Sequence, residues 1–221
     1  MKIAVLGGSF NPVHIGHLAL ADDVCVSLDY DKVIFVPSFK SPHKEMNGEV
    51  SALDRLKLLE AACSKDSRFE VDDCEIKRGG ISYTCETLKY LEKKYGKYLE
   101  KKIALILGSD LFSGFHLWKN ASEIAENYDL ILARRPKSSE NSDFNSFSNK
   151  ASGKYAELSL EDENFDAKTE SLFKNALYLE NPLVQISSTE IRARIANGLS
   201  FKYLVPQKVF KYIKNKGLYE N

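Results

Sequence analysis

Two histidines near the start of the chain, His14 and His17, have the spacing of a phosphate-binding pair. Residues three apart in a helix project from the same side, so both imidazoles would face one ligand. A histidine ring N–H donates hydrogen bonds to phosphate oxygens and to the charge that develops as a phosphoanhydride breaks. Gly16 between them leaves the space above the turn open. The alternative for either histidine is a metal ligand or a buried core residue.

The segments on either side of the histidines favour phosphate binding. Residues 2–6 form an apolar run typical of a strand, and residues 18–26 have the apolar spacing of a helix. Between them, Gly7 and Gly8 let the backbone approach a phosphate closely. The N–H groups at the helix start point toward such a ligand, and the helix dipole adds about half a positive charge there. The order strand, glycine-rich loop, helix therefore predicts an anion site.

This stretch, Gly-Gly-Ser-Phe-Asn-Pro-Val-His-Ile-Gly-His over residues 7–17, resembles the signature of the nucleotidylyltransferase superfamily. Its members transfer a nucleoside monophosphate from a triphosphate and share the motif H-x-G-H. The stretch is neither a dinucleotide-binding G-x-G-x-x-G nor a P-loop. One departure is Asn11, where aspartate is common. The resemblance implies that both histidines are catalytic, and that ATP contacts Gly7, Gly8, Ser9, Phe10 and His17.

A second stretch with phosphate chemistry reads Ile-Ser-Ser-Thr-Glu-Ile-Arg over residues 186–192. Ser187 or Ser188 is expected to begin a helix. The helix N–H groups and the hydroxyls of Ser188 and Thr189 would bind phosphate, with Arg192 one turn further on the same face. An ordinary capped amphipathic helix is the alternative. Paired with H-x-G-H, the stretch resembles the superfamily's second signature, which implies that Ser188, Thr189 and Arg192 bind the triphosphate of ATP. Arg192 is also expected to act in catalysis.

Further apolar runs predict the rest of the fold. They cover residues 31–37, 69–71, 102–107, 129–133 and 176–179. Helical segments lie between most of them, which predicts an α/β fold, a Rossmann-like doubly wound parallel sheet with flanking helices. Ligands of such sheets bind at the carboxyl ends of the strands. Gly108 and Asp110 follow one run, and they are expected to contact ATP, with the carboxylate on a ribose hydroxyl. A helix cap is the alternative for Asp110.

Two helices are predicted from caps and spacing. One covers residues 52–62 and is capped by Ser51. Its apolar residues recur at helical spacing and are expected in the core: Leu53, Leu56, Leu59 and Ala62. Arg55 on the same helix is expected to face solvent, and the alternative is that it faces the site. The other helix is expected to run through Leu88 and Leu91 toward Tyr95, capped by Ser82 or Thr84.

Later residues resemble those of one branch of the superfamily, the nicotinate mononucleotide adenylyltransferases. The likeness includes Pro-His-Lys ending at Lys44, Ile-Ser-Tyr-Thr ending at Thr84, Gly-x-Asp followed by Trp118, and Ala-Arg with Arg134. It implies that these four residues contact nicotinate mononucleotide and that Lys44 also acts in catalysis. A solvated basic loop is the alternative for Lys44, and a core position is the alternative for Trp118.

The reaction that this resemblance implies joins ATP and nicotinate mononucleotide to give deamido-NAD and pyrophosphate. The mononucleotide phosphate would attack the α-phosphorus of ATP in line. Both partners are already charged, so the reaction needs positioning and charge stabilisation, and no protein nucleophile or general base. Mg²⁺ is expected to arrive with ATP, held mainly by phosphate oxygens and water, and no protein metal site is expected.

Composition limits the other classes of function. The 221 residues include 31 Lys plus Arg and 31 Asp plus Glu, a balance that gives no electrostatic preference for nucleic acid or an anionic membrane. One domain is expected over residues 1–221, with a polar, partly mobile excursion at about 137–174. The absence of a signal peptide pattern and of a bilayer-spanning apolar run favours the cytoplasm. The oligomeric state is left open.

Alternative functions fit part of the same pattern. The same chemistry could use another acceptor, such as nicotinamide mononucleotide or phosphopantetheine. A non-catalytic nucleotide sensor would keep the site but would not need donors directed at a transition state. A dehydrogenase disagrees with the glycine pattern.

Overall fold

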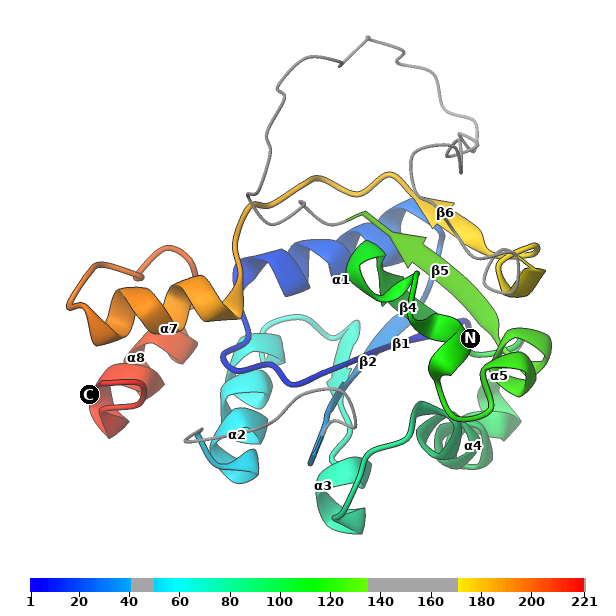
Figure 1. Cartoon of the computed structure of the whole chain (residues 1–221), viewed down its shortest axis with the longest axis horizontal. Helices are drawn as coiled ribbons and strands as arrows, with labels where there is room; N and C mark the ends of the chain where they lie inside the picture. Colours follow the sequence, from blue (N-terminus) through cyan, green and yellow to red (C-terminus); the bar gives the residue numbers. More distant parts are fainter. Residues whose placement is uncertain (41–49, 135–170, 221) are drawn as a thin grey trace, which may run out of the picture.

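The computed structural model describes residues 1–40, 50–134 and 171–220. Within them, six parallel strands form one sheet in the order β3, β2, β1, β4, β5, β6 (Figure 1). The strands are β1 (Ile3–Gly8), β2 (Lys32–Pro37), β3 (Phe69–Val71), β4 (Ala104–Gly108), β5 (Asp129–Ala133) and β6 (Leu177–Leu179). In such a doubly wound sheet the strand order reverses between β1 and β4, and ligands bind at this point. The predicted Rossmann-like fold is confirmed.

Helices cover both faces of the sheet. One face packs against α1 (Ile15–Ser27), α2 (Ala52–Cys63), α7 (Ser188–Ala196) and α8 (Gln207–Lys216). The other packs against α3 (Cys74–Arg78), α4 (Thr84–Tyr95) and α5 (Ala121–Asn127). Three short 3-10 helices complete the described elements: η1 (Gly96–Tyr98), η2 (Ser109–Leu111) and η3 (Phe115–Leu117).

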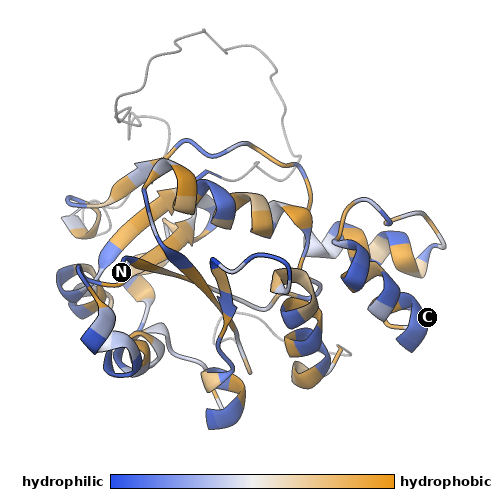
Figure 2. Cartoon of the chain, turned by 180° about the vertical axis from the view of Figure 1, so that it is seen from behind, coloured by the Kyte–Doolittle hydropathy of each residue, from blue (hydrophilic) through white to orange (hydrophobic). Residues whose placement is uncertain are grey.

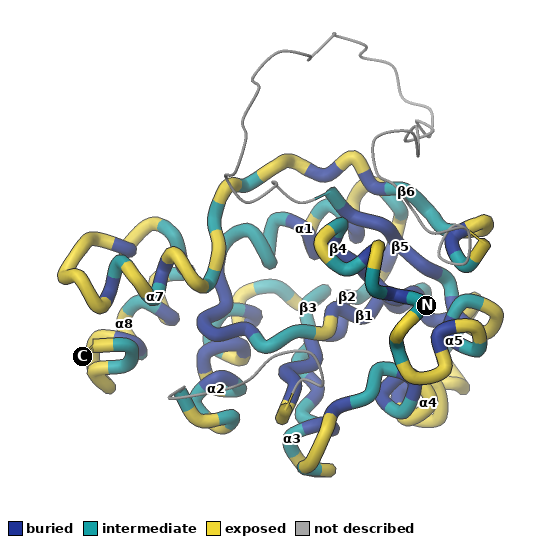
Figure 3. Tube along the Cα trace, in the orientation of Figure 1, coloured by how far each residue is buried: buried dark blue, intermediate teal, exposed yellow. Residues whose placement is uncertain are grey.

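Alternation along the strands builds the two cores. In β1, Ala4 and Leu6 belong to the core under α1 and α2, whereas Ile3 and Val5 belong to the core under α4 and α5. Successive strand residues point to opposite faces, so a strand buried on both faces consists of apolar residues throughout. The central strands are accordingly hydrophobic in Figure 2 and buried in Figure 3.

The predicted core face of α2 is wrong in part. Ser51 does cap the helix, since its Oγ accepts the N–H of Asp54 over 3.1 Å. However, Leu53 in the first turn is 61% exposed, and Arg55 is fully buried. The helix turns Arg55 toward the loops after β1 and β2, because its guanidinium finds backbone carbonyl acceptors there.

The segment between β3 and α4 also differs from prediction. It contains the short helix α3, which has too few turns to show a sequence period. The predicted cap of α4 is wrong: Tyr83 is the N-cap residue, with no side-chain cap, and Thr84 is the first helical residue. Ser82 instead accepts the backbone N–H of Phe39 over 3.1 Å.

Some predictions fall on residues that the structure does not describe. Lys44 is one of them, and so is most of the predicted excursion, apart from residues 171–174. In the described ranges, no helix has the length and apolarity needed to cross a membrane.

Candidate active site

The two histidines lie in contact at the start of α1. His14 is the N-cap residue, and its backbone N–H donates to Nδ1 of His17 over 3.2 Å. Their ring centroids are 3.7 Å apart. Because Nδ1 of His17 accepts a hydrogen bond, the neutral ring carries its proton on Nε2, which is therefore the donor that His17 can offer a ligand.

Gly16 is required by the position of the His14 ring. A Cβ atom added at Gly16 would lie 3.1 Å from Nδ1 of His14 and 3.2 Å from its Cε1. A larger residue would therefore push the imidazole away from the first turn of α1. The sequence interpretation of Gly16 as open space above the turn is thus refined: the His14 ring occupies that space.

The two glycines predicted in the loop are instead the last residues of β1, and the glycine-rich loop itself covers residues 9–14 between β1 and α1. A Cβ at Gly7 would meet no atom within 4 Å, so the space beside it is open. Phe10 is buried with φ of 46°, and its ring meets the His17 ring edge-on at 5.1 Å. Only the backbone of Phe10 is therefore placed to contact a nucleotide, while its ring supports His17 from below.

The second signature lies directly against this loop. Ser187 caps α7 by accepting the N–H of Glu190 over 3.1 Å, as one of the two predicted starts requires. The hydroxyl of Ser188 donates to the Pro12 carbonyl oxygen over 2.8 Å. Arg192 donates to the Asn11 carbonyl oxygen over 2.7 Å through Nη1. The fold therefore brings together two stretches that are about 180 residues apart in the chain.

Thr189 lies beside Arg192 on the exposed side of the same turn. Its hydroxyl oxygen accepts from Nη2 of Arg192 over 3.3 Å. One edge of the guanidinium is thus bound to the loop and the other points toward Thr189. This arrangement orients Arg192 before any ligand binds.

The expectation that Arg55 faces solvent is wrong, and the alternative that it faces the site agrees with the structure. Its side chain is buried and donates to the Ser9 carbonyl over 2.6 Å, the Ser38 carbonyl over 2.7 Å and the Phe39 carbonyl over 3.3 Å. It thereby joins the glycine-rich loop to the loop after β2 and places a positive charge beneath both. Periodicity gives no signal for such a residue, because its partners are backbone carbonyls of distant segments.

Gly108 and Asp110 lie at the carboxyl end of β4, next to the end of β1. Gly108 is the N-cap of η2, and Asn120 is the N-cap of α5, so Asp110 caps neither element. Its side chain is exposed at the point where the strand order reverses. This position suits a group that contacts a ribose.

The segments that hold Thr84 and Trp118 are tied together. Lys119 pairs with Glu86 of α4 over 2.8 Å, and its ammonium lies 4.2 Å from the centre of the Tyr83 ring. Trp118 is half-buried, with its ring centroid 5.4 Å from that of Phe115. The tryptophan therefore packs on the core and also retains exposed surface, so both sequence interpretations are compatible.

Arg134 follows β5 and is held by Asn181, a residue that no sequence pattern singles out. Asn181 accepts the Arg134 N–H over 2.8 Å and donates to the Arg134 carbonyl over 3.1 Å. β5 and β6 are paired strands, and these two hydrogen bonds extend the contact past the ends of both strands. Buried amides that complete such pairing are not distinguishable in sequence from other loop asparagines.

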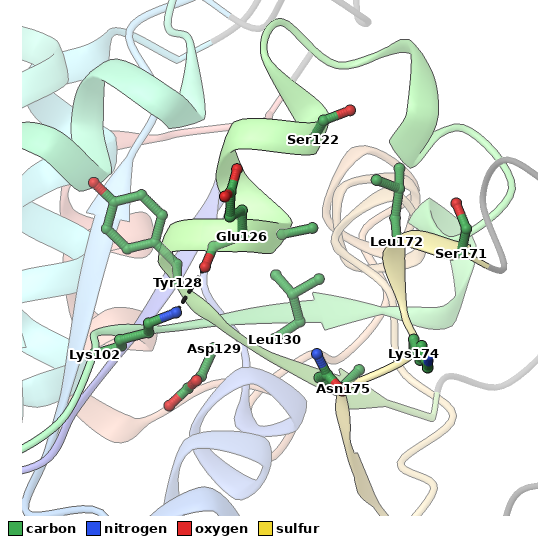
Figure 4. Close-up of a pocket in the computed structure, with 12 residues that line it drawn as sticks. Lys102, Ser122, Glu126, Tyr128, Asp129, Leu130, Ser171, Leu172, Lys174 and Asn175 are labelled. Carbon is green, nitrogen blue, oxygen red and sulfur yellow. Dashed lines mark hydrogen bonds between the residues drawn. The ribbon is translucent and has the colours of Figure 1, made fainter.

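A cavity of about 390 Å³ lies elsewhere in the molecule (Figure 4). It is bordered by α5, the start of β5 and residues 171–176. At the side of this cavity, Lys102 Nζ donates to the Glu126 carbonyl over 2.6 Å. None of the predicted site residues lines it, since they belong to the opposite, carboxyl ends of the strands.

Known proteins resemble this chain over most of its length. Residues 5–194 match the model of the cytidylyltransferase-like family. A probable nicotinate-nucleotide adenylyltransferase from Treponema pallidum is 40% identical over 224 residues, covering 100% of both chains. One from Borrelia garinii subsp. bavariensis is 37% identical over 219 residues, covering 99% of this chain and 95% of the relative.

The fold has close counterparts among solved structures. A Plasmodium falciparum nicotinic acid mononucleotide adenylyltransferase complexed with NaAD has a TM-score of 0.71 at 17% identity, over 99% of this chain and 97% of its own. A putative nicotinate-nucleotide adenylyltransferase from Vibrio parahaemolyticus has a TM-score of 0.64 at 20% identity, over 100% and 97%. These structures support the fold, and the full-length relatives identify the family. The chain belongs to the cytidylyltransferase-like family and, within it, to the nicotinate-nucleotide adenylyltransferases.

Proposed function

We propose that this protein transfers the adenylyl group of ATP to nicotinate mononucleotide, producing deamido-NAD and pyrophosphate for NAD biosynthesis. The observation that carries the proposal is the meeting of the two signatures, in which Arg192 and Ser188 hydrogen-bond to the loop just before His14 and His17. Hydrogen-bond donors of the kinds that bind phosphate, from segments near both ends of the chain, come together there. The names of the full-length relatives supply the acceptor.

The reaction would proceed by in-line displacement. A phosphate oxygen of the mononucleotide forms a bond to the α-phosphorus of ATP as the bond from that phosphorus to the bridging oxygen breaks, and pyrophosphate leaves with the electron pair. No proton has to be removed from the attacking phosphate. The protein's contribution is to hold the two substrates in line and to stabilise the charge on the transferring phosphoryl oxygens.

The donors for that charge come from the loop, α1 and α7. Nε2 of His17 and the N–H groups at the start of α1 would face the phosphates, with His14 packed against His17. Arg192 would reach the β- and γ-phosphates, and Lys44, which lies outside the described residues, would approach from the loop after β2. The remaining contacts proposed for ATP are Gly7, Gly8, Ser9, Phe10, Gly108, Asp110, Ser188 and Thr189.

The acceptor would lie on the side of α4 and η3. Trp118 offers the exposed part of its ring to the pyridine ring, and Thr84 is in the first turn of α4. Arg134 at the end of β5 would bind the mononucleotide phosphate together with Lys44. The Lys119–Glu86 ion pair supports this arrangement because it joins the two segments that carry Thr84 and Trp118.

Mg²⁺ is proposed to accompany ATP. The donors around the loop are N–H, imidazole and guanidinium groups, which bind phosphate oxygens. Mg²⁺ prefers oxygen ligands and retains several waters. The protein residues therefore fit a metal that the nucleotide phosphates carry, and when bound it would neutralise part of their charge. A cytoplasmic location is also proposed, because the substrates of this reaction are water-soluble.

The test is pyrophosphate release from ATP and Mg²⁺ with three acceptors offered separately: nicotinate mononucleotide, nicotinamide mononucleotide and phosphopantetheine. We expect the first to have the highest kcat/KM. A preference for either of the others would keep the reaction class and change the acceptor. No release with any of them, together with measurable ATP binding, would favour the non-catalytic sensor.

A further inference from the structure

The last residues of the chain reach the active-site loop. The hydroxyl of Tyr219 donates to Oδ1 of Asn11 over 2.6 Å, a contact between residues 208 positions apart. Asn11 is 1% exposed and lies in the glycine-rich loop, three residues before His14.

The backbone after α8 has the shape needed for this contact. Gly217 ends the helix with φ of 59°, and Tyr219 has φ of 66°, a region that residues with side chains seldom adopt. The N–H of Leu218 donates to the Ile213 carbonyl over 3.1 Å, and Lys214 pairs with Glu220 over 2.9 Å. Contacts on both sides of Tyr219 therefore hold its backbone in an unfavourable conformation that returns its ring toward the loop.

The C-terminal part of the chain surrounds the loop from this side. Arg192 binds the Asn11 carbonyl, Ser188 binds the Pro12 carbonyl, and the Ile15 N–H donates to the Leu204 carbonyl over 3.1 Å. These bonds fix the backbone. In the described part of the chain, the Tyr219 hydroxyl is the hydrogen-bond partner of the Asn11 side chain, whose Nδ2 has no acceptor there.

We propose that Tyr219 is a positioning residue for adenylyl transfer. Through Oδ1 of Asn11 its hydroxyl orders the loop that ends at His14, and so fixes the loop N–H groups and His17 against the phosphates. This inference rests on the proposed function. Since the loop uses the side-chain oxygen and not the amide nitrogen, an aspartate at position 11 can take the same hydrogen bond.

Tyr219→Phe is the direct test, because it removes one oxygen and keeps the ring. We expect kcat for pyrophosphate release to fall about tenfold, with KM for ATP and for the mononucleotide changed less than twofold. Tyr212→Phe is the matched control. It removes the hydroxyl of a tyrosine on α8, which donates to Asp54 on α2 over 2.7 Å and does not contact Asn11. It should leave kcat unchanged. An unchanged kcat in Tyr219→Phe, or an equal loss in both variants, would overturn the proposal.

A double-mutant comparison separates positioning from a general structural effect. Tyr219→Phe should lower kcat in the wild type and in Asn11→Asp, which retains the acceptor, but not further in Asn11→Ala, which lacks it. The same loss in the Asn11→Ala background would show that Tyr219 acts by another route and would refute the inference.

Hydrogen exchange tests the same contact without catalysis. In Tyr219→Phe the amides of residues 13–17 should exchange at least several-fold faster than in the wild type or in Tyr212→Phe. Unchanged exchange would refute the ordering of the loop. If the wild type released no pyrophosphate with any pyridine mononucleotide, the proposed function would fail, and the exchange result would still decide whether Tyr219 orders the loop.

Discussion

The backbone N–H of His14 donates to Nδ1 of His17 over 3.2 Å, so the residue that caps α1 also fixes the tautomer of its neighbour. The same contact satisfies an N–H group that would otherwise lack a partner at the helix start. Nε2 of His17 is thereby left as an N–H donor. One hydrogen bond thus links the stability of the helix to the chemistry proposed for it.

His17→Ala should separate these two effects. We expect kcat to fall about 10²- to 10³-fold, the usual loss when a donor to a developing charge is removed. The free energy of unfolding should fall by about 1 kcal/mol, as for a lost helix cap. Steady-state kinetics and urea unfolding measure the two quantities.

Ser51→Ala provides the control, because it removes the cap of α2 and leaves the histidines intact. It should destabilise the protein by a similar amount without lowering kcat. If His17→Ala kept wild-type turnover, His17 would have no part in the mechanism.

The sequence predicts the backbone frame of this site well but not the contacts that lock it. Local patterns predict the strands, the loop and the start of α7, because apolar periodicity and helix caps depend on residues that are close in the sequence. Arg55, Asn181 and Tyr219 act on backbone or amide groups far away in the chain. Their roles depend on how the elements pack, which no local window contains.

Trp118→Ala should affect the two substrates unequally. Its ring is half-buried against Phe115, and the proposed function places its exposed part against the pyridine ring. We expect KM for the mononucleotide to rise about 5- to 30-fold, which corresponds to the loss of about 1–2 kcal/mol of ring stacking. KM for ATP should change less than twofold.

Leu117→Ala removes a neighbouring side chain that is 72% exposed, and it should have no such effect. Equal increases of both Michaelis constants in Trp118→Ala would argue against stacking on the pyridine.

The buried carboxylate of Asp72 should make the fold sensitive to acid. Burial by itself would raise its pKa, but hydrogen bonds from Lys94 Nζ, over 2.7 Å, and from the Cys74 N–H outweigh burial and hold the pKa below the ordinary 3.8. A carboxyl whose folded pKa is lowered stabilises the protein above its unfolded pKa, and this stabilisation is lost as the pH falls through the folded value.

Urea unfolding between about pH 6 and pH 3 measures this loss. In Asp72→Asn the free energy of unfolding should be lower at pH 6 by about 1–2 kcal/mol and should fall less steeply with acid. Asp73→Asn alters the adjacent carboxylate, which pairs with the exposed Lys77, and should keep the wild-type slope. An identical slope in the wild type and Asp72→Asn would contradict the assignment.

Arg55→Met should weaken both the fold and the reaction. The substitution leaves the Ser9 and Ser38 carbonyls without their buried donor, so the free energy of unfolding should fall by about 3 kcal/mol. Lys57→Met, on the exposed side of the same helix, should change the free energy of unfolding by less than about 0.5 kcal/mol.

Arg55→Lys keeps the charge but lacks the fork that reaches two loops at once. The Arg55→Lys variant should therefore recover part of the lost stability but little of the lost kcat, with kcat measured well below the melting temperature of the variant. Full recovery of kcat by lysine would show that the charge beneath the loops matters and that joining the two carbonyls does not.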